Sequence, residues 1–324
     1  MIENQKLKGE LKGESIRKEY FKNFGEKETG FGKVFGSPYT FLYILGDVLF
    51  DSSVSAWAYL MCQKIGQRKL FNKVFLTHSH YDHIGGAWVI KKYFPDVKFY
   101  GHSNINKVLL SQNALKTIED FNNKDSEEVA SVWNETKEYL NFVPISLDNT
   151  FDFQNGFIID CEGVRCIYSP GHTRDTVSFY VSDYNALVMS ESMGIPNHRF
   201  NFVLPEFLSS YKLYVDSYQR LKEIVISRKV KNFLLPHIMY FEYHSDVIDF
   251  LRLSEESLEN YVKFIVFSID KVKIDKNNVE DKKVEEVFDF VFEKFYVNYE
   301  LSQPLYGFKA NVTSQIKTVI KELI

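Results

Sequence analysis

The chain has 324 residues, 45% of them hydrophobic and 25% charged, which is close to ordinary soluble proteins. The formal net charge of −4 argues against nucleic acid as the main partner, because binding a phosphate backbone needs a basic surface. No run of about 18 or more apolar residues occurs, so we expect neither a membrane span nor a membrane partner.

The first half of the chain predicts strands that alternate with helices. Residues 1–20 are polar and rich in Lys and Glu, unlike a secretory signal, so we expect a polar N-terminal segment and a cytoplasmic protein. Strands are expected within 39–50, around a turn at Gly46 and Asp47, and then at 73–76 and 97–100. Helices are expected at 86–94, 104–120 and 127–140, the last two separated by a polar break at 122–126.

The second half predicts a group of strands followed by helices. Strands are expected at 151–160, 163–168, 177–182 and 186–189, then a helix at 206–226 and a strand at 232–235. The order of strands, helices, strands and helix suits an α+β fold with two packed mixed sheets and helices outside. We assign this fold to residues 21–245.

Residues 246–324 predict a helical C-terminal extension. Segments 247–266, 279–295 and 311–323 each repeat apolar residues at three- and four-residue spacing. We expect these helices to pack on the sheets and to cover the mouth of a site between them. The alternative is an independent helical hairpin used for dimerisation, which keeps a homodimer among the expected partners.

The stretch from Thr77 to Gly86 carries the strongest chemical signal. It follows an apolar run and contains His78, His80, Asp82 and His83. Residues two apart in an extended segment point the same way, so His78 and His80 can bind one metal ion. Where the chain turns, Asp82 and His83 can reach a second ion. Gly85 and Gly86 then let the backbone pass close to the site before a helix begins.

This pattern resembles the signature of the metallo-β-lactamase-fold hydrolase superfamily. The resemblance implies a four-layer αββα sandwich with one or two metal ions at one edge of the sheets. It also implies that His172, in a sharp Pro-Gly turn, completes the first metal's set with His78 and His80. By the same resemblance, His237 after Pro236 joins Asp82 and His83 on the second metal.

Position 191 departs from the family pattern. Most members have an Asp here that bridges the two metals, whereas this chain has Glu191. A glutamate is one methylene longer, so the same bridge needs the backbone to retreat. The alternatives to a bridge are a ligand to one metal only or a proton acceptor, and we expect Glu191 to be a metal ligand.

Four further residues are predicted to support the site. The resemblance assigns Asp51 to holding a ligand histidine, since such a carboxylate fixes the tautomer of the ring. Asp175 is expected to do similar work near His172 or to cap its own turn. The segment 193–207 directly follows Glu191, so His198 and Phe200 are predicted to contact the substrate.

Free thiols are expected at Cys62, Cys161 and Cys166.

Together these features predict a hydrolase that uses a metal-bound hydroxide. Two divalent ions roughly 3.5–4 Å apart can share a water and lower its pKa towards ~7. We expect zinc, with iron or manganese as alternatives, and we expect Asp82 to orient the nucleophile as well as ligate. No serine-based catalytic motif competes with this prediction.

The substrate class is predicted from two kinds of feature: residues that differ from those of particular family members, and the helical C-terminal extension. His83 stands where the best-known β-lactamases have Arg, and His80 where flavodiiron relatives have Glu, so both activities are disfavoured. The helical extension and the 29 Phe and 20 Tyr resemble thioesterase-like members. We therefore expect a small-molecule thioester or ester with an apolar acyl group. A phosphodiester hydrolase, a mononuclear iron oxygenase acting on a thiol, and a regulatory binder with a vestigial metal site remain as alternatives.

Overall fold

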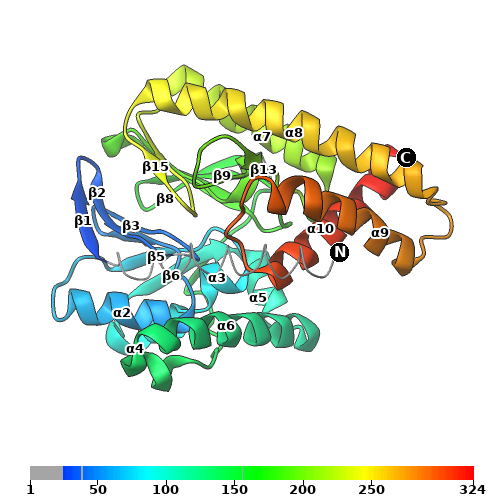
Figure 1. The fold of residues 1–324 in the computed structure, drawn as a ribbon. Coiled ribbons are helices and arrows are strands. Elements are labelled where there is room, and N and C mark those ends of the chain that lie inside the picture. Colours follow the sequence, from blue (N-terminus) through cyan, green and yellow to red (C-terminus); the bar gives the residue numbers. More distant parts are fainter. Residues whose placement is uncertain (1–24, 38, 155) are drawn as a thin grey trace.

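The structure is a computed structural model that describes residues 25–37, 39–154 and 156–324. The polar N-terminal segment predicted at 1–20 therefore lies outside the described residues. Figure 1 shows two sheets stacked between layers of helices, with the long helix 244–272 across the top and the last two helices at one side. This is the α+β sandwich with a helical C-terminal region that the sequence predicted.

The first sheet has seven strands in sequence order. They are β1 (Glu26–Thr29), β2 (Gly32–Phe35), β3 (Leu42–Leu45), β4 (Val48–Phe50), β5 (Lys73–Phe75), β6 (Lys98–His102) and β7 (Asn149–Phe151). Neighbours from β1 to β4 pair antiparallel, and those from β4 to β7 pair parallel. Helices cover its outer face: α2 (Ser55–Ile65), α3 (Tyr81–Ile84), α4 (Ala87–Tyr93), α5 (Ser103–Val108) and α6 (Gln112–Val132).

The second sheet has six strands in the order β15-β14-β11-β10-β9-β8. Their bounds are β8 (Ile158–Cys161), β9 (Val164–Tyr168), β10 (Val177–Val181), β11 (Ala186–Val188), β14 (Asn232–Leu234) and β15 (Tyr240–Phe241). A small hairpin of β12 (Ile195–Pro196) and β13 (Val203–Leu204) lies beside it. The pair β11 and β14 is parallel, so the chain leaves both strands at the same edge.

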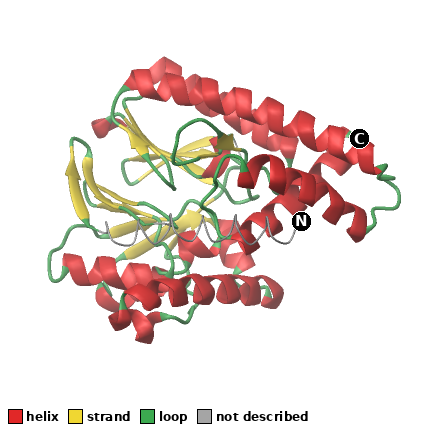
Figure 2. Ribbon diagram, viewed as in Figure 1, coloured by secondary structure: helices red, strands yellow, loops and turns green. Residues whose placement is uncertain are grey.

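Aromatic rings fill the space between the two sheets. Phe50 and Phe75 of the first sheet both meet Phe179 of the second, with ring centroids 5.5 Å apart in each pair. Tyr100 stacks on Phe75 at 4.7 Å. Aromatic pairs add to the free energy of apolar burial, so these rings stabilise the layer between the sheets. Figure 2 shows the strands enclosed between helices above and below.

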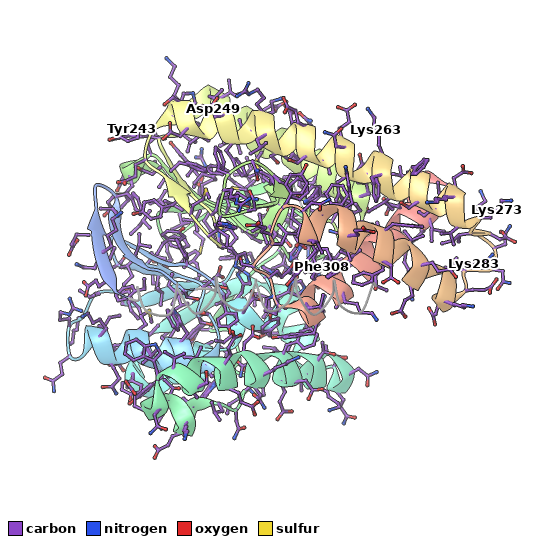
Figure 3. All side chains as sticks on the ribbon, viewed as in Figure 1. Tyr243, Asp249, Lys263, Lys273, Lys283 and Phe308 are labelled. Atoms are coloured by element: carbon purple, nitrogen blue, oxygen red, sulfur yellow. The ribbon has the colours of Figure 1, made fainter. Side chains whose placement is uncertain are left out.

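The C-terminal region consists of three helices that pack on the sandwich. They are α8 (His244–Val272), α9 (Asp281–Val291), which continues as a π-helical turn (Phe292–Val297), and α10 (Leu305–Leu323). On α8, Val247 and Phe250 are buried in one apolar cluster with Phe233 of the second sheet. Phe308 of α10 lies among the helices, whereas Lys263 and Lys283 point outward (Figure 3). These contacts correspond to the packed alternative, not to an independent hairpin.

Several predicted elements need correction. The helix expected at 104–120 is divided at 109–111 into α5 and α6. The polar break expected at 122–126 is wrong, because α6 runs through it. Asn122 is buried in that helix, where its side-chain oxygen accepts from the Ser55 backbone N–H at 3.0 Å and its amide donates to the Leu140 carbonyl at 3.1 Å. The polar residues thus fasten the helix to its neighbours.

Two further corrections concern element boundaries. The strand expected at 151–160 is two strands in different sheets, since β7 ends at Phe151 and β8 begins at Ile158. The helix expected from 206 is α7 (Tyr211–Arg228), capped by the Ser210 side chain. The residues before it form a loop bonded to the Gly171 carbonyl.

None of the described helices combines the length and apolar character needed to cross a membrane.

Candidate metal centre

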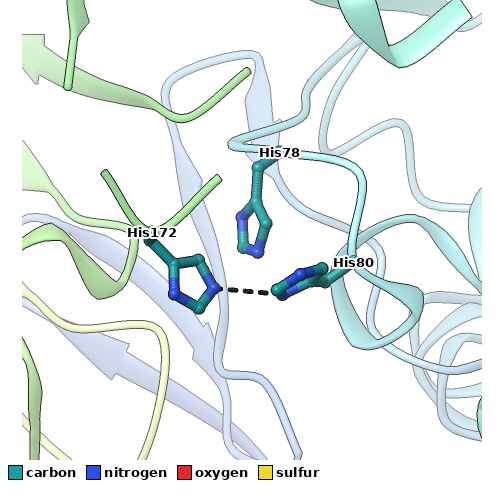
Figure 4. A group of neighbouring side chains, drawn as sticks. All are labelled: His78, His80 and His172. Carbon is teal, nitrogen blue, oxygen red and sulfur yellow. Dashed lines mark hydrogen bonds between the residues drawn. The ribbon is translucent and has the colours of Figure 1, made fainter. Parts of the chain in front are cut away.

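The residues that follow β5 bring a first group of imidazoles together. His78 leaves the strand, and His80 immediately precedes α3. His172 reaches them from the turn between β9 and β10, with its Nε2 3.0 Å from His80 Nδ1 (Figure 4). One nitrogen from each ring lies within 4.8 Å of the others, which suits coordination of a single ion by three imidazoles.

A second group forms beside the first. The ligand atoms of Asp82, His83 and His237 lie within 4.8 Å of one another. Asp82 Oδ2 is 3.8 Å from the Nε2 atoms of both His83 and His237. His237 follows β14 and precedes Ile238, whose φ of +71° is unfavourable for a β-branched residue. Backbone strain of this kind accompanies functional positions in folded proteins.

Glu191 lies between the two groups. Its Oε1 is 2.9 Å from His83 Nε2 and 2.8 Å from His237 Nε2. Its Oε2 is 3.7 Å from the Nε2 atoms of both His78 and His172. One carboxylate oxygen therefore faces each group.

The chemistry of these donors fits bound divalent cations. Glu191 Oε2 and His78 Nε2 are buried, and neither has a hydrogen-bond partner among the described residues. Buried polar atoms are normally satisfied by a partner. Two sets of nitrogen and oxygen donors around these atoms are the ligands that zinc, iron and manganese accept.

Asp51 holds the N-terminal candidate ligands in place. It follows β4 in the left-handed conformation, with φ of +60°, and its Oδ2 accepts from His83 Nδ1 at 2.8 Å. It also accepts from the Thr77 backbone N–H at 2.8 Å and from the Thr77 hydroxyl. The Thr77 Oγ1 is 3.0 Å from His78 Nδ1. Because Nδ1 of His83 is bonded to Asp51, its Nε2 is directed at the site. The role of Thr77 was not predicted from the sequence.

Asp175 was expected either to hold the His172 ring or to cap its own turn, and it does not contact the ring. Its carboxylate turns back to accept a hydrogen bond from the Thr173 hydroxyl, which corresponds to the turn-capping alternative. The backbone carbonyl of Glu206 instead accepts from His172 Nδ1, at 2.6 Å. Glu206 was missed, although a carboxylate within the apolar run 202–208 was a signal for a buried role.

His198 and Phe200 were predicted to contact the substrate, but the structure does not bring them to the site. His198 Nε2 lies 3.9 Å from a Glu300 carboxylate oxygen, and the Phe200 ring packs on Phe241 at 5.5 Å. Asn197 closes this turn by accepting from the Asn201 backbone N–H, which directs both side chains away from the metal groups. Asn197 itself lines the cavity over the site.

Two glycines permit the close packing behind the ligands. A Cβ on Gly86 would lie 2.3 Å from Ala58 Cβ of α2, and one on Gly171 would lie 2.3 Å from Tyr214 Cα of α7. Gly171 also has φ of +133°, which L-residues rarely adopt. Glycine at these positions lets the ligand-bearing turns lie directly against helices.

Burial and charge set the protonation of the cluster. Burial lowers the pKa of His80 and of His172 to about 4, and the pKa of His78 falls well below its usual value for the same reason. Burial opposes the charge on His83, yet Glu191, Asp51 and Asp82 raise the pKa of His83 well above its usual value. The first group thus presents neutral rings, the form that binds metal.

A cavity of about 860 Å³ opens over both groups. His80, Asp82, His172, Glu191 and His237 line its base. Residues of α6 and α10 line its walls, so the C-terminal region forms part of the cavity. Apolar wall residues include Val108, Ile118, Phe121, Leu204, Leu208 and Leu301.

Comparisons with known proteins show which chains this one resembles. The chain is 28% identical over 165 residues to the metallo-beta-lactamase fold-containing protein ST1585 of Sulfurisphaera tokodaii, a match covering 49% of this chain and 58% of that protein. The crystal structure of ST1585 aligns with 69% of this chain and 81% of its own, at 23% identity and a TM-score of 0.44.

A second solved structure shares the fold over a longer span. The metallo-beta-lactamase family protein TTHA1429 from Thermus thermophilus aligns with 85% of this chain and 89% of its own, at 15% identity and a TM-score of 0.50. The family model described as the metallo-beta-lactamase superfamily matches residues 46–226, more than half of the chain. On this match and the geometry above, the chain belongs to the metallo-beta-lactamase superfamily.

Proposed function

We propose that this protein is a metal-dependent hydrolase that cleaves an ester or thioester with an apolar acyl group. The observation that carries the proposal is the position of Glu191 between two groups of metal-binding side chains at the base of a cavity. His78, His80 and His172 would hold one divalent ion, Asp82, His83 and His237 a second, and Glu191 would contact both. Zinc is the first candidate, and iron or manganese the alternatives.

When bound, such ions act as Lewis acids and make water acidic enough to supply hydroxide near neutral pH. The protein's own groups prepare the rest of the reaction. Asp82 lines the cavity and is partly exposed, so its carboxylate can orient an attacking water and accept its proton. Asp51 fixes His83, and the Glu206 carbonyl fixes His172, which keeps both rings in one orientation.

The size and lining of the cavity support a small molecule with an apolar part. About 860 Å³ is within the range of roughly 300–1,000 Å³ that small-molecule sites occupy. Apolar side chains of α6 and of the β13–α7 loop line the same cavity as the proposed ligands. An acyl chain packed against them would place its carbonyl carbon at the base.

A phosphodiester hydrolase is the second candidate. Lys107 of α5 and Arg174 of the β9–β10 turn both line the cavity and are exposed. Two cations at the cavity favour a substrate that carries negative charge. A mononuclear iron oxygenase binds one ion, so it would not use the second group of donors, Asp82, His83 and His237.

Elemental analysis and steady-state assays test the proposal. We expect about two divalent ions per chain and turnover of medium-chain acyl thioesters or esters, and both should be lost in His80→Ala. Glu119→Gln, a change on the exposed face of α6, is the matched control and should retain both. Turnover of bis(p-nitrophenyl) phosphate without any acyl substrate would replace the leading candidate by the second, and one iron per chain would overturn the two-ion site.

A further inference from the structure

Glu206 is a buried acid in the cavity that metal binding does not use. It belongs to the loop between β13 and α7, its side chain has no exposed surface, and it lines the cavity wall. Its Oε2 accepts a hydrogen bond from Asn311 Nδ2 at 3.0 Å. Its Oε1 is buried and has no hydrogen-bond partner among the described residues. Since an unsatisfied buried carboxyl oxygen destabilises the fold, it calls for a role.

One face of α10 lines the same cavity as Glu206. Gly307, Ala310, Asn311 and Ser314 lie at helical spacing on one face of α10, and all four line the cavity. Three of them are small, so the helix presents one polar amide in an otherwise open wall. Residues with long side chains would fill the space that these leave.

Hydrogen bonds from α10 fix the loop that carries Glu206. Gln315 Nε2 donates to the Pro205 carbonyl at 2.6 Å, and Ser314 and Thr318 both donate to the Leu208 carbonyl at 3.0 Å. The loop is therefore held on both sides of Glu206. A polar group held this firmly can select among ligands, because little freedom remains to be lost on binding.

We propose that Glu206 and Asn311 form a polar subsite that binds an uncharged hydroxyl group on the acyl part of the substrate, an inference that rests on the proposed hydrolysis of acyl compounds. A hydroxyl group both donates and accepts, so it satisfies Oε1 whether the carboxyl group is ionised or protonated. The apolar wall then receives the rest of the chain. A substrate without the hydroxyl leaves Oε1 buried and unpaired, and sites of this kind discriminate against such analogues.

Binding of a matched ligand set to the metal-loaded full-length protein tests the subsite. The probes are hexanoate, 3-hydroxyhexanoate and 6-hydroxyhexanoate, measured by isothermal titration calorimetry at pH 7. We expect at least one hydroxylated probe to bind about 10-fold more tightly than hexanoate, the size of one good hydrogen bond. Equal affinity for all three probes would overturn the proposal.

Two substitutions at position 206 separate hydrogen bonding from shape. In Glu206→Gln, the side-chain oxygen accepts from Asn311 and the amide N–H faces the cavity, so the preference should stay within about 3-fold of the original protein. In Glu206→Met, a side chain of similar length makes no such bond, and the preference should vanish. Both variants keep the backbone carbonyl that holds His172. A preference that survives Glu206→Met would overturn the proposal.

Asn311→Leu provides a test in a different helix if Glu206→Met fails to fold. Without the Asn311 amide the carboxyl group loses its anchor, and we expect the preference to fall at least 3-fold while metal content is unchanged. An unchanged preference would count against the subsite. Since affinity is measured without turnover, absent hydrolysis with a Glu206-dependent preference would remove the proposed function alone. Hydrolysis with no preference would remove the subsite alone.

Discussion

The two sheets supply the proposed metal-binding side chains in different ways. The first sheet provides His78, His80, Asp82 and His83 from one stretch of six residues, supported by Asp51 at the end of the neighbouring parallel strand. The second sheet provides His172, Glu191 and His237 from three separate connections. The first half of the centre is thus built by local chain geometry, and the second half requires distant segments to be held in register.

The C-terminal helix α10 supports the second half through the β13–α7 loop. Its side chains bond to the carbonyls of Pro205 and Leu208, and the loop between them accepts the His172 Nδ1–H at the Glu206 carbonyl. The Leu208 backbone N–H donates in turn to the Gly171 carbonyl beside that histidine. A helix more than 130 residues away in sequence therefore positions His172, a proposed metal ligand.

The largest effect is expected where the two halves meet. Glu191→Gln keeps the size of the side chain but removes the negative charge that faces both ligand groups. We expect metal content to fall to one ion per chain or fewer and hydrolysis to fall more than about 10²-fold, since even the partners that hold ligands are worth 10- to 100-fold.

Elemental analysis and kcat/KM measured on the same preparation check this expectation. Glu119→Gln serves again as the control, because it makes the same chemical change on an exposed helix face. Two ions per chain in the Glu191 variant would show that the halves bind metal independently.

A smaller loss is expected from the support of the first half. Asp51→Asn weakens the bond that fixes His83 and the contacts to Thr77, so we expect metal affinity to fall about 10- to 100-fold. Competition with a chromophoric chelator measures the affinity. Retention of full affinity would mean that the strands alone orient the ligands.

Loss of a contact that supports the second half is expected to lower the free energy of unfolding more clearly than the metal affinity. Gln315→Leu removes the buried bonds to the Pro205 carbonyl and to the Tyr261 hydroxyl, which leaves polar atoms unpaired. We expect unfolding free energy to fall by about 1–3 kcal/mol and metal affinity to fall less than 10-fold. Urea denaturation and the chelator assay measure the two quantities.

The matched control for this helix is Lys321→Gln, which changes an exposed residue of its last turn. It should leave both quantities unchanged. If Gln315→Leu lowers metal affinity as much as Asp51→Asn does, then the second half depends on its scaffold as strongly as the first does.

The same contrast explains what the sequence could and could not predict. His78, His80, Asp82 and His83 share one turn, so their spacing alone indicated a metal site, and the motif suggested the family. His172, Glu191 and His237 were placed only through resemblance to that family. In the structure, all three nevertheless lie beside the first four.

Tertiary contacts decided what the sequence missed. Asn122 looked like a helix break, because its preference for turns is strong, but buried hydrogen bonds override that preference in α6. His198 and Phe200 were placed by their nearness to Glu191 in sequence, whereas the turn at Asn197 directs them elsewhere. Glu206 and Asn311 are far apart in the chain, so no spacing rule connects them.

The smallest expected effect uses the cysteines as reporters of the two halves. Burial raises the pKa of Cys62, in α2 of the first half, and of Cys166, in β9 of the second. At pH 8 both thiols are therefore almost entirely protonated and should react slowly with a thiol reagent, whereas the partly exposed Cys161 should react first. Removing metal with a chelator should speed labelling of Cys166 more than that of Cys62, because the second half holds its ligands by longer-range contacts. Equal acceleration, measured by peptide mass spectrometry, would mean that both halves loosen together and that the local turn gives the first half no independent stability.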